Sequence, residues 1–209
     1  ANLHNYQEEY QTVVPEKLVG YGRKRNSLKD VVLCIDQSGS MAPSIIYSSI
    51  FGAVMASLPS VSMRFVLFDT AVVDLTDELH DPVDLLFGAQ LGGGTDIHKA
   101  LTYCEGHISR PSDTVMVLIS DLEEGGSPSG MLKAAARLVD SGVTLVTLLA
   151  LSDEGQPYYD TRHAARFAAL GIPVFACTPN QFPDLMAAAL SKKDLHLWAK
   201  GQGIAPKKG

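Results

Sequence analysis

The amino-acid sequence predicts an α/β fold: a doubly wound, mostly parallel central sheet with one short antiparallel edge strand and helices on both faces. Apolar segments of strand length alternate with helical patterns along almost all of residues 30–190, and no internal repeat interrupts them. The runs 31–35 and 115–119 are apolar throughout, which is typical of strands buried on both faces. Parallel strands of this kind are joined by right-handed crossovers.

The first half of the pattern is expected to contain a strand, a helix, a strand, an edge strand and a short helix at residues 30–36, 43–58, 61–68, 72–75 and 81–87. Pro43 suits the first position of a helix, because the N–H that proline lacks would be unpaired there in any case. Asp81 and Pro82 fit the N-cap and first position of the short helix in the same way. The run at 72–75 follows its neighbour so closely that an antiparallel edge strand is the economical interpretation.

The second half is expected to alternate helix and strand at residues 97–108, 115–119, 128–139, 143–151, 158–170, 172–176 and 182–190. Thr95 and Asp96 stand where the N-cap of the first of these helices belongs. Ser127 and Pro128 begin the next helix, and Gly171 ends the alanine-rich one after it.

We expect three parts in the chain: an extension at residues 1–29, a folded domain at 30–190 and a tail at 191–209. The extension is too apolar for a free tail, so it packs on the domain or belongs to a preceding one. The tail holds Trp198, which either anchors a partner or packs back on its own domain. Because the chain does not begin with Met, we expect a piece of a longer protein.

The composition disfavours several classes of function. A net charge of −6 over 209 residues disfavours non-specific nucleic-acid binding. The longest apolar run, at 143–151, is far shorter than the roughly 20 residues of a membrane-spanning helix. Cys34, Cys104 and Cys177 are widely spaced in apolar stretches, and we interpret them as reduced core residues of a cytoplasmic protein. No nucleophile motif, zinc-protease motif or phosphate-binding loop is present, so we do not expect an enzyme.

Asp36, Ser38 and Ser40 come at the end of the first predicted strand. Alternate residues of an extended chain share one face, so a curling loop can direct all three oxygen side chains at one point. Gly39 supplies the backbone freedom for that curl. One carboxylate and two hydroxyls are hard donors that suit Mg²⁺, with Mn²⁺ or Ca²⁺ as alternatives. The same residues also fit a turn that caps a helix, and alone they do not decide between the two.

Two later loops offer donors of the same kind. Thr95 stands in a glycine-rich loop, and Asp121 follows the apolar run 115–119. In an open α/β sheet such loops meet in the crevice beyond the carboxyl ends of the strands, so we expect both residues to join the first three around one cation. Mg²⁺ takes about six oxygens, so water or other groups must complete the set. Asp69 either joins the outer shell of this metal or forms a turn.

The order Asp-x-Ser-x-Ser, distant Thr and distant Asp resembles the von Willebrand factor A (VWA) domain with its metal-ion-dependent adhesion site. The resemblance covers about residues 28–190. It implies that the serines and the threonine contact the metal, that the carboxylates often act through water, and that a partner's carboxylate fills the remaining position. Many family members continue with Gly after the last Asp, whereas this chain has Leu122, Glu123 and Glu124. The shape of the third loop therefore stays open, and the two glutamates disfavour a highly acidic partner.

The sequence also resembles bacterial cytosolic VWA proteins that work beside MoxR-type AAA+ ATPases, which implies an adaptor role in such an assembly. Two alternatives remain open: a metal that only stabilises the fold, and a Mg²⁺-dependent phosphotransferase of the aspartyl-phosphate type. The phosphotransferase is disfavoured because Ser38 stands where such enzymes usually carry a second acid, and no lysine ends a strand.

Overall fold

The computed structural model describes residues 6–7, 12–13, 29–44, 61–78, 93–149, 158–176, 178 and 180–203. The helix predicted at 81–87, Cys177 and most of the helix predicted at 43–58 lie outside these residues. So does most of the extension at 1–29, in which β1 (Tyr6–Gln7) and β2 (Thr12–Val13) form an antiparallel pair.

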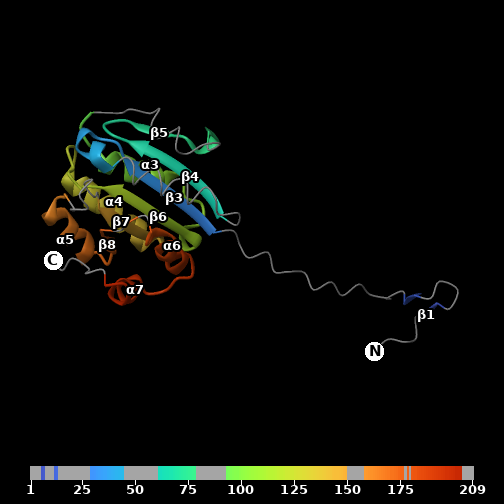
Figure 1. Ribbon diagram of the computed structural model, residues 1–209. Coiled ribbons are helices and arrows are strands. Elements are labelled where there is room, and N and C mark those ends of the chain that lie inside the picture. Colours follow the sequence, from blue (N-terminus) through green and yellow to red (C-terminus); the bar gives the residue numbers. More distant parts are fainter. Residues whose placement is uncertain are drawn as a thin grey trace.

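A six-stranded sheet lies at the centre of the domain, in the order β5-β4-β3-β6-β7-β8 (Figure 1). Its strands are β3 (Lys29–Asp36), β4 (Val61–Phe68), β5 (Val72–Asp74), β6 (Thr114–Ser120), β7 (Thr144–Leu149) and β8 (Val174–Phe175). The edge strand β5 runs antiparallel to β4, and the other neighbouring pairs are parallel. This arrangement confirms the predicted fold class.

Helices cover both faces of the sheet, because successive side chains of each strand point to opposite sides. On one face, Val32 and Cys34 of β3 pack in a core with α3 (Ile97–Gly106), α4 (Pro128–Asp140) and α5 (Thr161–Ala169). On the other face, Val31 and Leu33 pack with α6 (Phe182–Leu190) and α7 (Leu195–Gly201). The sheet is therefore a buried middle layer, and its strand ends are left to carry polar groups.

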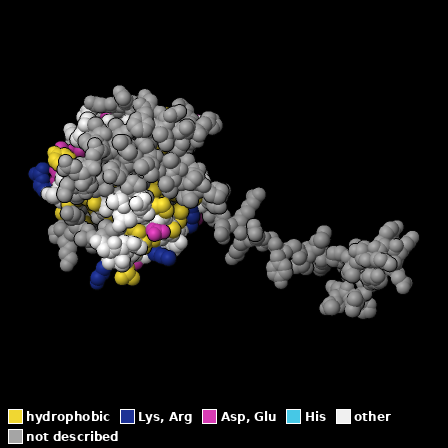
Figure 2. All heavy atoms as spheres, viewed as in Figure 1, with side chains coloured by type: hydrophobic (Ala, Val, Ile, Leu, Met, Phe, Trp, Pro, Cys, Tyr) yellow, Lys and Arg dark blue, Asp and Glu magenta, His cyan; other side chains and the backbone are white. Residues whose placement is uncertain are grey.

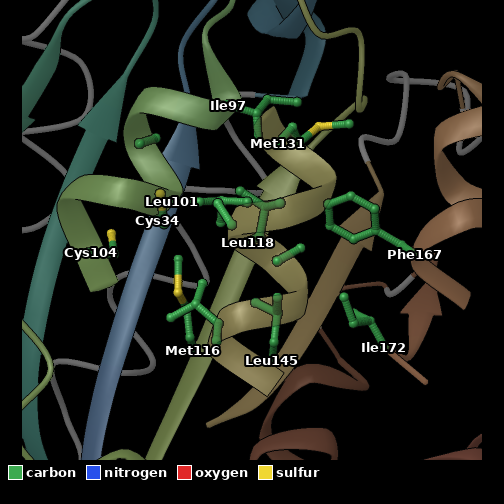
Figure 3. Packing of buried hydrophobic residues seen from close by; sticks show 14 of the residues in the cluster. Cys34, Ile97, Leu101, Cys104, Met116, Leu118, Met131, Leu145, Phe167 and Ile172 are labelled. Carbon is green, nitrogen blue, oxygen red and sulfur yellow. The ribbon is translucent and has the colours of Figure 1, made fainter. Parts of the chain in front are cut away.

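Cys34 and Cys104 are free thiols inside the first of these cores, one on β3 and one on α3 (Figure 3). Burial raises the pKa of the Cys34 thiol well above its usual value, and a hydrogen bond with Cys104 adds to the shift. A thiol kept protonated in an apolar core is unreactive. For these two residues, the interpretation as reduced core cysteines is confirmed.

Several elements differ from the sequence prediction, and side-chain caps explain two of these differences. Helix α5 begins at Thr161 because the Asp160 carboxylate accepts hydrogen bonds from the backbone N–H groups of Arg162 and His163. The short helix α7 was not predicted, and Asp194 caps its start in the same way. Strand β8 is shorter than its apolar run.

The tail packs back on its own domain. Leu195 and Ala199 of α7 are buried, and the Trp198 ring lies edge-on to Phe175 with 6.3 Å between ring centres. The second of the two interpretations of Trp198 is thus the one that the structure supports. Among the described residues, no helix combines the length and apolar character needed to cross a membrane.

Candidate metal centre

Three loops meet beyond the carboxyl ends of β3 and β6, and backbone hydrogen bonds join them. Gly39 N of the first loop donates to Gly93 O of the second at 3.3 Å, and Gly125 N of the third loop donates to Thr95 O at 2.9 Å. This is the crevice in which the sequence placed the site.

The first loop curls back on itself directly after β3. Asp36 Oδ1 accepts a hydrogen bond from Ser38 N at 2.9 Å, and the Ser38 and Ser40 hydroxyl oxygens lie 3.2 Å apart. Asp36 and Ser38 are buried, whereas Ser40 is exposed. A 3₁₀ helix, η3 (Gly39–Ser44), follows at once, before the predicted helix start at Pro43. The three side chains therefore lie together, as the spacing predicted.

Ser120 at the end of β6 fixes the Asp36 carboxylate. Its hydroxyl donates to Asp36 Oδ2 at 2.7 Å and accepts a hydrogen bond from Leu122 N at 3.0 Å. Ser120 is fully buried, and the parallel register of β3 with β6 brings the two strand ends side by side. The sequence did not predict this role; its only sign was a polar residue closing an apolar run.

Asp121 has an unused acceptor in the protein interior. The residue is fully buried, and its Oδ1 accepts a hydrogen bond from Glu123 N at 3.0 Å. Its Oδ2 has no hydrogen-bond partner within the described part of the chain. A buried carboxylate oxygen without a donor is costly, so this atom fits a place beside a cation.

The two buried carboxylates also lack a basic neighbour. No ion pair of the described residues reaches Asp36 or Asp121. Burial raises the pKa of Asp36 to about 6, against the hydrogen bonds from Ser120 and Ser38 that lower it, and the negative charge of Asp121 raises it further. The site therefore disfavours its own negative charge until a positive charge is supplied.

Thr95 is placed by contacts on both sides of its loop. Thr95 itself is buried, and Asp96 caps α3 by accepting a hydrogen bond from Lys99 N at 2.8 Å. Asp69 forms a turn, since its Oδ1 accepts from Ala71 N at 2.7 Å, and its Oδ2 accepts from Gly93 N at 3.2 Å. Asp69 thus holds the glycine-rich loop in place.

Gly125 allows the third loop to approach the second. A Cβ atom added at this position would lie 2.9 Å from the carbonyl oxygen of Thr95, which is too close for any side chain. The glycine is therefore required by a close backbone approach rather than by its own dihedral angles.

The Glu124 carboxylate joins the starts of two helices. Its Oε2 accepts from Ile97 N at 2.7 Å and His98 N at 3.2 Å in α3, and its Oε1 accepts from Gly126 N at 2.8 Å and Ser127 N at 2.7 Å beside α4. These N–H groups are unpaired at helix starts, so a carboxylate there is stabilised by them. The sequence marked Glu124 only as an acid near the metal, and this capping role was not predicted.

Leu122 occupies a backbone conformation that favours glycine. Its φ is +61°, although its side chain is fully buried in the core beneath α3 and α4. The Leu122 carbonyl oxygen lies 2.9 Å from His163 Nδ1 of α5. The chain thus reaches a left-handed turn after Asp121 without glycine, because burial of the leucine offsets a strain of about 1–2 kcal/mol.

The five predicted site residues, Asp36, Ser38, Ser40, Thr95 and Asp121, all lie on these three joined loops. They combine two carboxylates with three hydroxyls, which suits a hard cation and not zinc. In the parts of the chain described, no group of three His, Cys, Asp or Glu side chains forms a metal site. A metal here would depend on the hydroxyls as well as the carboxylates.

Comparison with solved structures identifies the same fold in other proteins. A von Willebrand factor type A protein from Catenulispora acidiphila has a TM-score of 0.61 at 16% identity, over 78% of this chain and 42% of its own. An aerotolerance-related membrane protein from Bacteroides fragilis has a TM-score of 0.62 at 15% identity, over 78% of this chain and 99% of its own. The manganese-loaded TRAP protein of Plasmodium vivax has a TM-score of 0.51 at 18% identity, over 65% and 60%. At these identities the likeness shows the fold alone.

Comparison of sequences identifies the family of the chain as well as its fold. The chain is 38% identical over 192 residues to the uncharacterized protein YehP of Escherichia coli (strain K12), in a match that covers 91% of this chain and 51% of that relative. The chain therefore spans about half the length of YehP. The family described as VWA domain containing CoxE-like protein matches residues 1–186. With the α/β fold and the three joined loops, this match shows that the chain belongs to the CoxE-like family of VWA domain proteins.

Proposed function

We propose that this domain binds a partner protein through a Mg²⁺ ion held by Asp36, Ser38, Ser40, Thr95 and Asp121. An Asp or Glu side chain of the partner completes the coordination of the ion. The observation that carries this proposal is the buried Oδ2 of Asp121, which has no donor among the described residues and lies near a second buried carboxylate.

The donor set explains why the partner group is a carboxylate. Three of the five side chains are neutral hydroxyls, so a divalent ion retains much of its positive charge toward solvent. Its remaining position favours an anionic oxygen from outside the domain. Mn²⁺ or Ca²⁺ can replace Mg²⁺ with such ligands, and the manganese-loaded Plasmodium vivax neighbour shows that one protein of this fold carries a divalent ion.

Membership of the CoxE-like family supports a protein partner, and we propose an adaptor that works in the cytoplasm beside a MoxR-type AAA+ ATPase. We propose neither nucleic acid nor membrane as a partner, and no catalytic step.

The test is affinity capture by the full chain in Mg²⁺ and in EDTA, with Thr95→Val as the isosteric variant that lacks the hydroxyl. We expect an AAA+ ATPase to be retained in Mg²⁺, released in EDTA and not retained by Thr95→Val. Equal recovery in Mg²⁺ and EDTA overturns the metal-bridged mechanism.

Thermal unfolding of the same samples separates binding from a purely structural metal. Mg²⁺ at tenfold over its dissociation constant adds about 1.4 kcal/mol to the free energy of unfolding. A metal that serves stability alone would change unfolding by this amount and leave capture unchanged.

A further inference from the structure

We propose that a second acidic side chain of the same partner binds in a cleft beside the metal centre, with Arg166 and Arg162 as its anchors. This inference rests on the proposed metal-bridged function, since it assigns a further contact to that partner.

The cleft has a volume of about 550 Å³ and lies between residues 123–125 of the third loop and the first turns of α5, which supply Asp160, Arg162, His163 and Arg166. Two hydrogen bonds connect its wall to the candidate metal centre. Asp160 N donates to Asp121 O at 2.8 Å, and His163 Nδ1 lies 2.9 Å from Leu122 O. The cleft wall is thus joined to the segment that carries Asp121, and we infer that a partner bound at the metal also reaches the cleft.

The acids that line the cleft already have donors. Glu124 accepts four backbone hydrogen bonds at the starts of α3 and α4. Asp160 Oδ1 accepts from Arg162 N at 2.8 Å and His163 N at 3.0 Å. Glu123 accepts a hydrogen bond from the Tyr158 hydroxyl, which raises the pKa of that tyrosine. Their negative charges are thus largely engaged by the protein itself.

The basic groups of the cleft are less engaged. Elsewhere in the domain, guanidinium groups pair with carboxylates, as in the contacts of Arg64 with Asp74, Arg110 with Asp30 and Arg137 with Glu105. Arg166 is exposed, and no described residue accepts a hydrogen bond from it. Arg162 reaches the Asp160 carboxylate only at 3.3 Å, with its side chain 86% exposed. Figure 2 shows basic and acidic side chains side by side at this edge of the molecule, near α5.

The chemistry of these groups identifies the ligand. A guanidinium presents five N–H donors in a planar fork that matches a carboxylate, and arginine cannot lose its charge. The partner therefore carries two acids, one for the metal and one for the cleft. A uniformly acidic surface is disfavoured, because Glu123, Glu124 and Asp160 also line the cleft.

Synthetic peptides test the inference. One peptide of Gly and Ser carries a single Glu; a series adds a second Glu two to eight residues away; matched peptides carry Gln instead of the second Glu. Each is titrated into the ¹⁵N-labelled full chain at about 0.15 M salt, and NMR follows both the dissociation constant and the Arg166 Nε–H signal.

We expect the single-Glu peptide to bind in Mg²⁺ and not in EDTA. At the best spacing, the second Glu tightens binding by about three- to tenfold and shifts the Arg166 signal, whereas Gln does neither. Arg166→Gln removes the gain and keeps the single-Glu affinity. We expect the fold to be preserved in that variant, since the side chain is exposed and forms no ion pair with a described residue. Lys200→Gln, an exposed position on α7, is the matched control and keeps the full gain.

Two results overturn the inference: no spacing improves on the single Glu, or the improvement survives the double variant Arg162→Gln, Arg166→Gln. Both leave the metal-bridged function standing. Single-Glu binding that is equal in Mg²⁺ and EDTA overturns the proposed function instead. In that case an Arg166 shift caused by the second Glu still supports the cleft, and its absence overturns the cleft too.

Discussion

The two ends of strand β3 differ in how they accommodate negative charge. At its start, Lys29 Nζ lies 2.5 Å from Asp113 Oδ1, and Arg110 lies 2.6 Å from Asp30 Oδ1, all on partly exposed side chains. At its end, Asp36 is 2% exposed, and its described hydrogen-bond donors, among them the Ser38 amide and the Ser120 hydroxyl, are neutral.

The pKa values of the two ends shift in opposite directions. A hydrogen bond and charge from Lys29 hold the pKa of Asp113 below its usual value, whereas burial raises the pKa of Asp36 to about 6. The amino end of the sheet supplies its own counter-charges. In the described part of the chain, no ion pair does so for Asp36 or Asp121 at the carboxyl end, which is consistent with the cation that we propose there.

The largest expected effect is on the pH dependence of stability in EDTA. Because the folded pKa of Asp36 is raised above its unfolded value, its contribution is fully present below about pH 4 and is lost as the pH rises through about 6. The loss is at most about 3 kcal/mol in the free energy of unfolding. Asp113 contributes with the opposite sign, since its lowered pKa gives stability that is lost as the pH falls.

Urea unfolding between pH 4 and 8 measures this dependence. We expect Asp36→Asn to remove the decrease in the free energy of unfolding above pH 4. Asp113→Asn, the control beside the start of β3, leaves this decrease unchanged. Saturating Mg²⁺ reduces the decrease, because a cation favours the ionised carboxylate. A pH profile that is identical in wild type and Asp36→Asn contradicts the assignment of the decrease to this residue.

The next effect is on the affinity for metal. We expect Asp36→Asn to weaken Mg²⁺ or Mn²⁺ binding by roughly 10- to 100-fold, because a neutral amide supplies less negative charge to the ion. Asp30→Asn, at the start of the same strand, removes only a partly exposed ion pair. It should leave metal affinity unchanged and lower stability by about 0–1 kcal/mol. Isothermal titration calorimetry with both ions is the measurement, and equal affinities for the two variants would falsify the site.

The smallest effect concerns two glycines: Gly125 of the third loop, which lies against Thr95, and Gly106 at the end of α3. We expect Gly125→Ala to destabilise the fold by about 1–2 kcal/mol and to weaken metal binding several-fold, because the new Cβ lies 2.9 Å from Thr95 O. Gly106 ends α3 near the amino end of the sheet, and a Cβ there meets nothing within 4 Å. Gly106→Ala should therefore be neutral or stabilising, by up to about 1 kcal/mol. Urea unfolding and metal titration of both variants measure these effects. If Gly125→Ala changes neither stability nor metal affinity, the close approach of Gly125 to Thr95 is contradicted.

The sheet, and the placement of the five candidate ligands on loops at one edge of it, could be predicted because each depends on local chemistry. Apolar runs specify buried strands, and parallel strands carry their loops to one edge. The contacts that hold these side chains in place could not be predicted from the sequence. The Ser120 hydroxyl reaches Asp36 only through the register of two strands that are distant in sequence, and Glu124 caps α3 only because that helix starts beside α4.

Leu122 and α7 show two other reasons why a structural feature could not be predicted from the sequence. Local propensity argues against a left-handed leucine, and only its burial in the core makes the conformation acceptable. Helix α7 stands among residues that break structure, and its one local sign was Asp194 ahead of a short apolar stretch.

The double cap by Glu124 has a mechanical consequence. One carboxylate joins the start of α3, next to Thr95, to the segment that leads from Asp121 into α4, so we expect these two loops to shift together. The first loop is joined to this pair by the hydrogen bond from Gly39 N to Gly93 O at 3.3 Å and, at its base, by the Ser120 hydroxyl, which donates to Asp36 Oδ2 at 2.7 Å. We therefore expect the exposed residue Ser40, beyond these two attachments, to shift more readily on binding than the two loops that Glu124 joins.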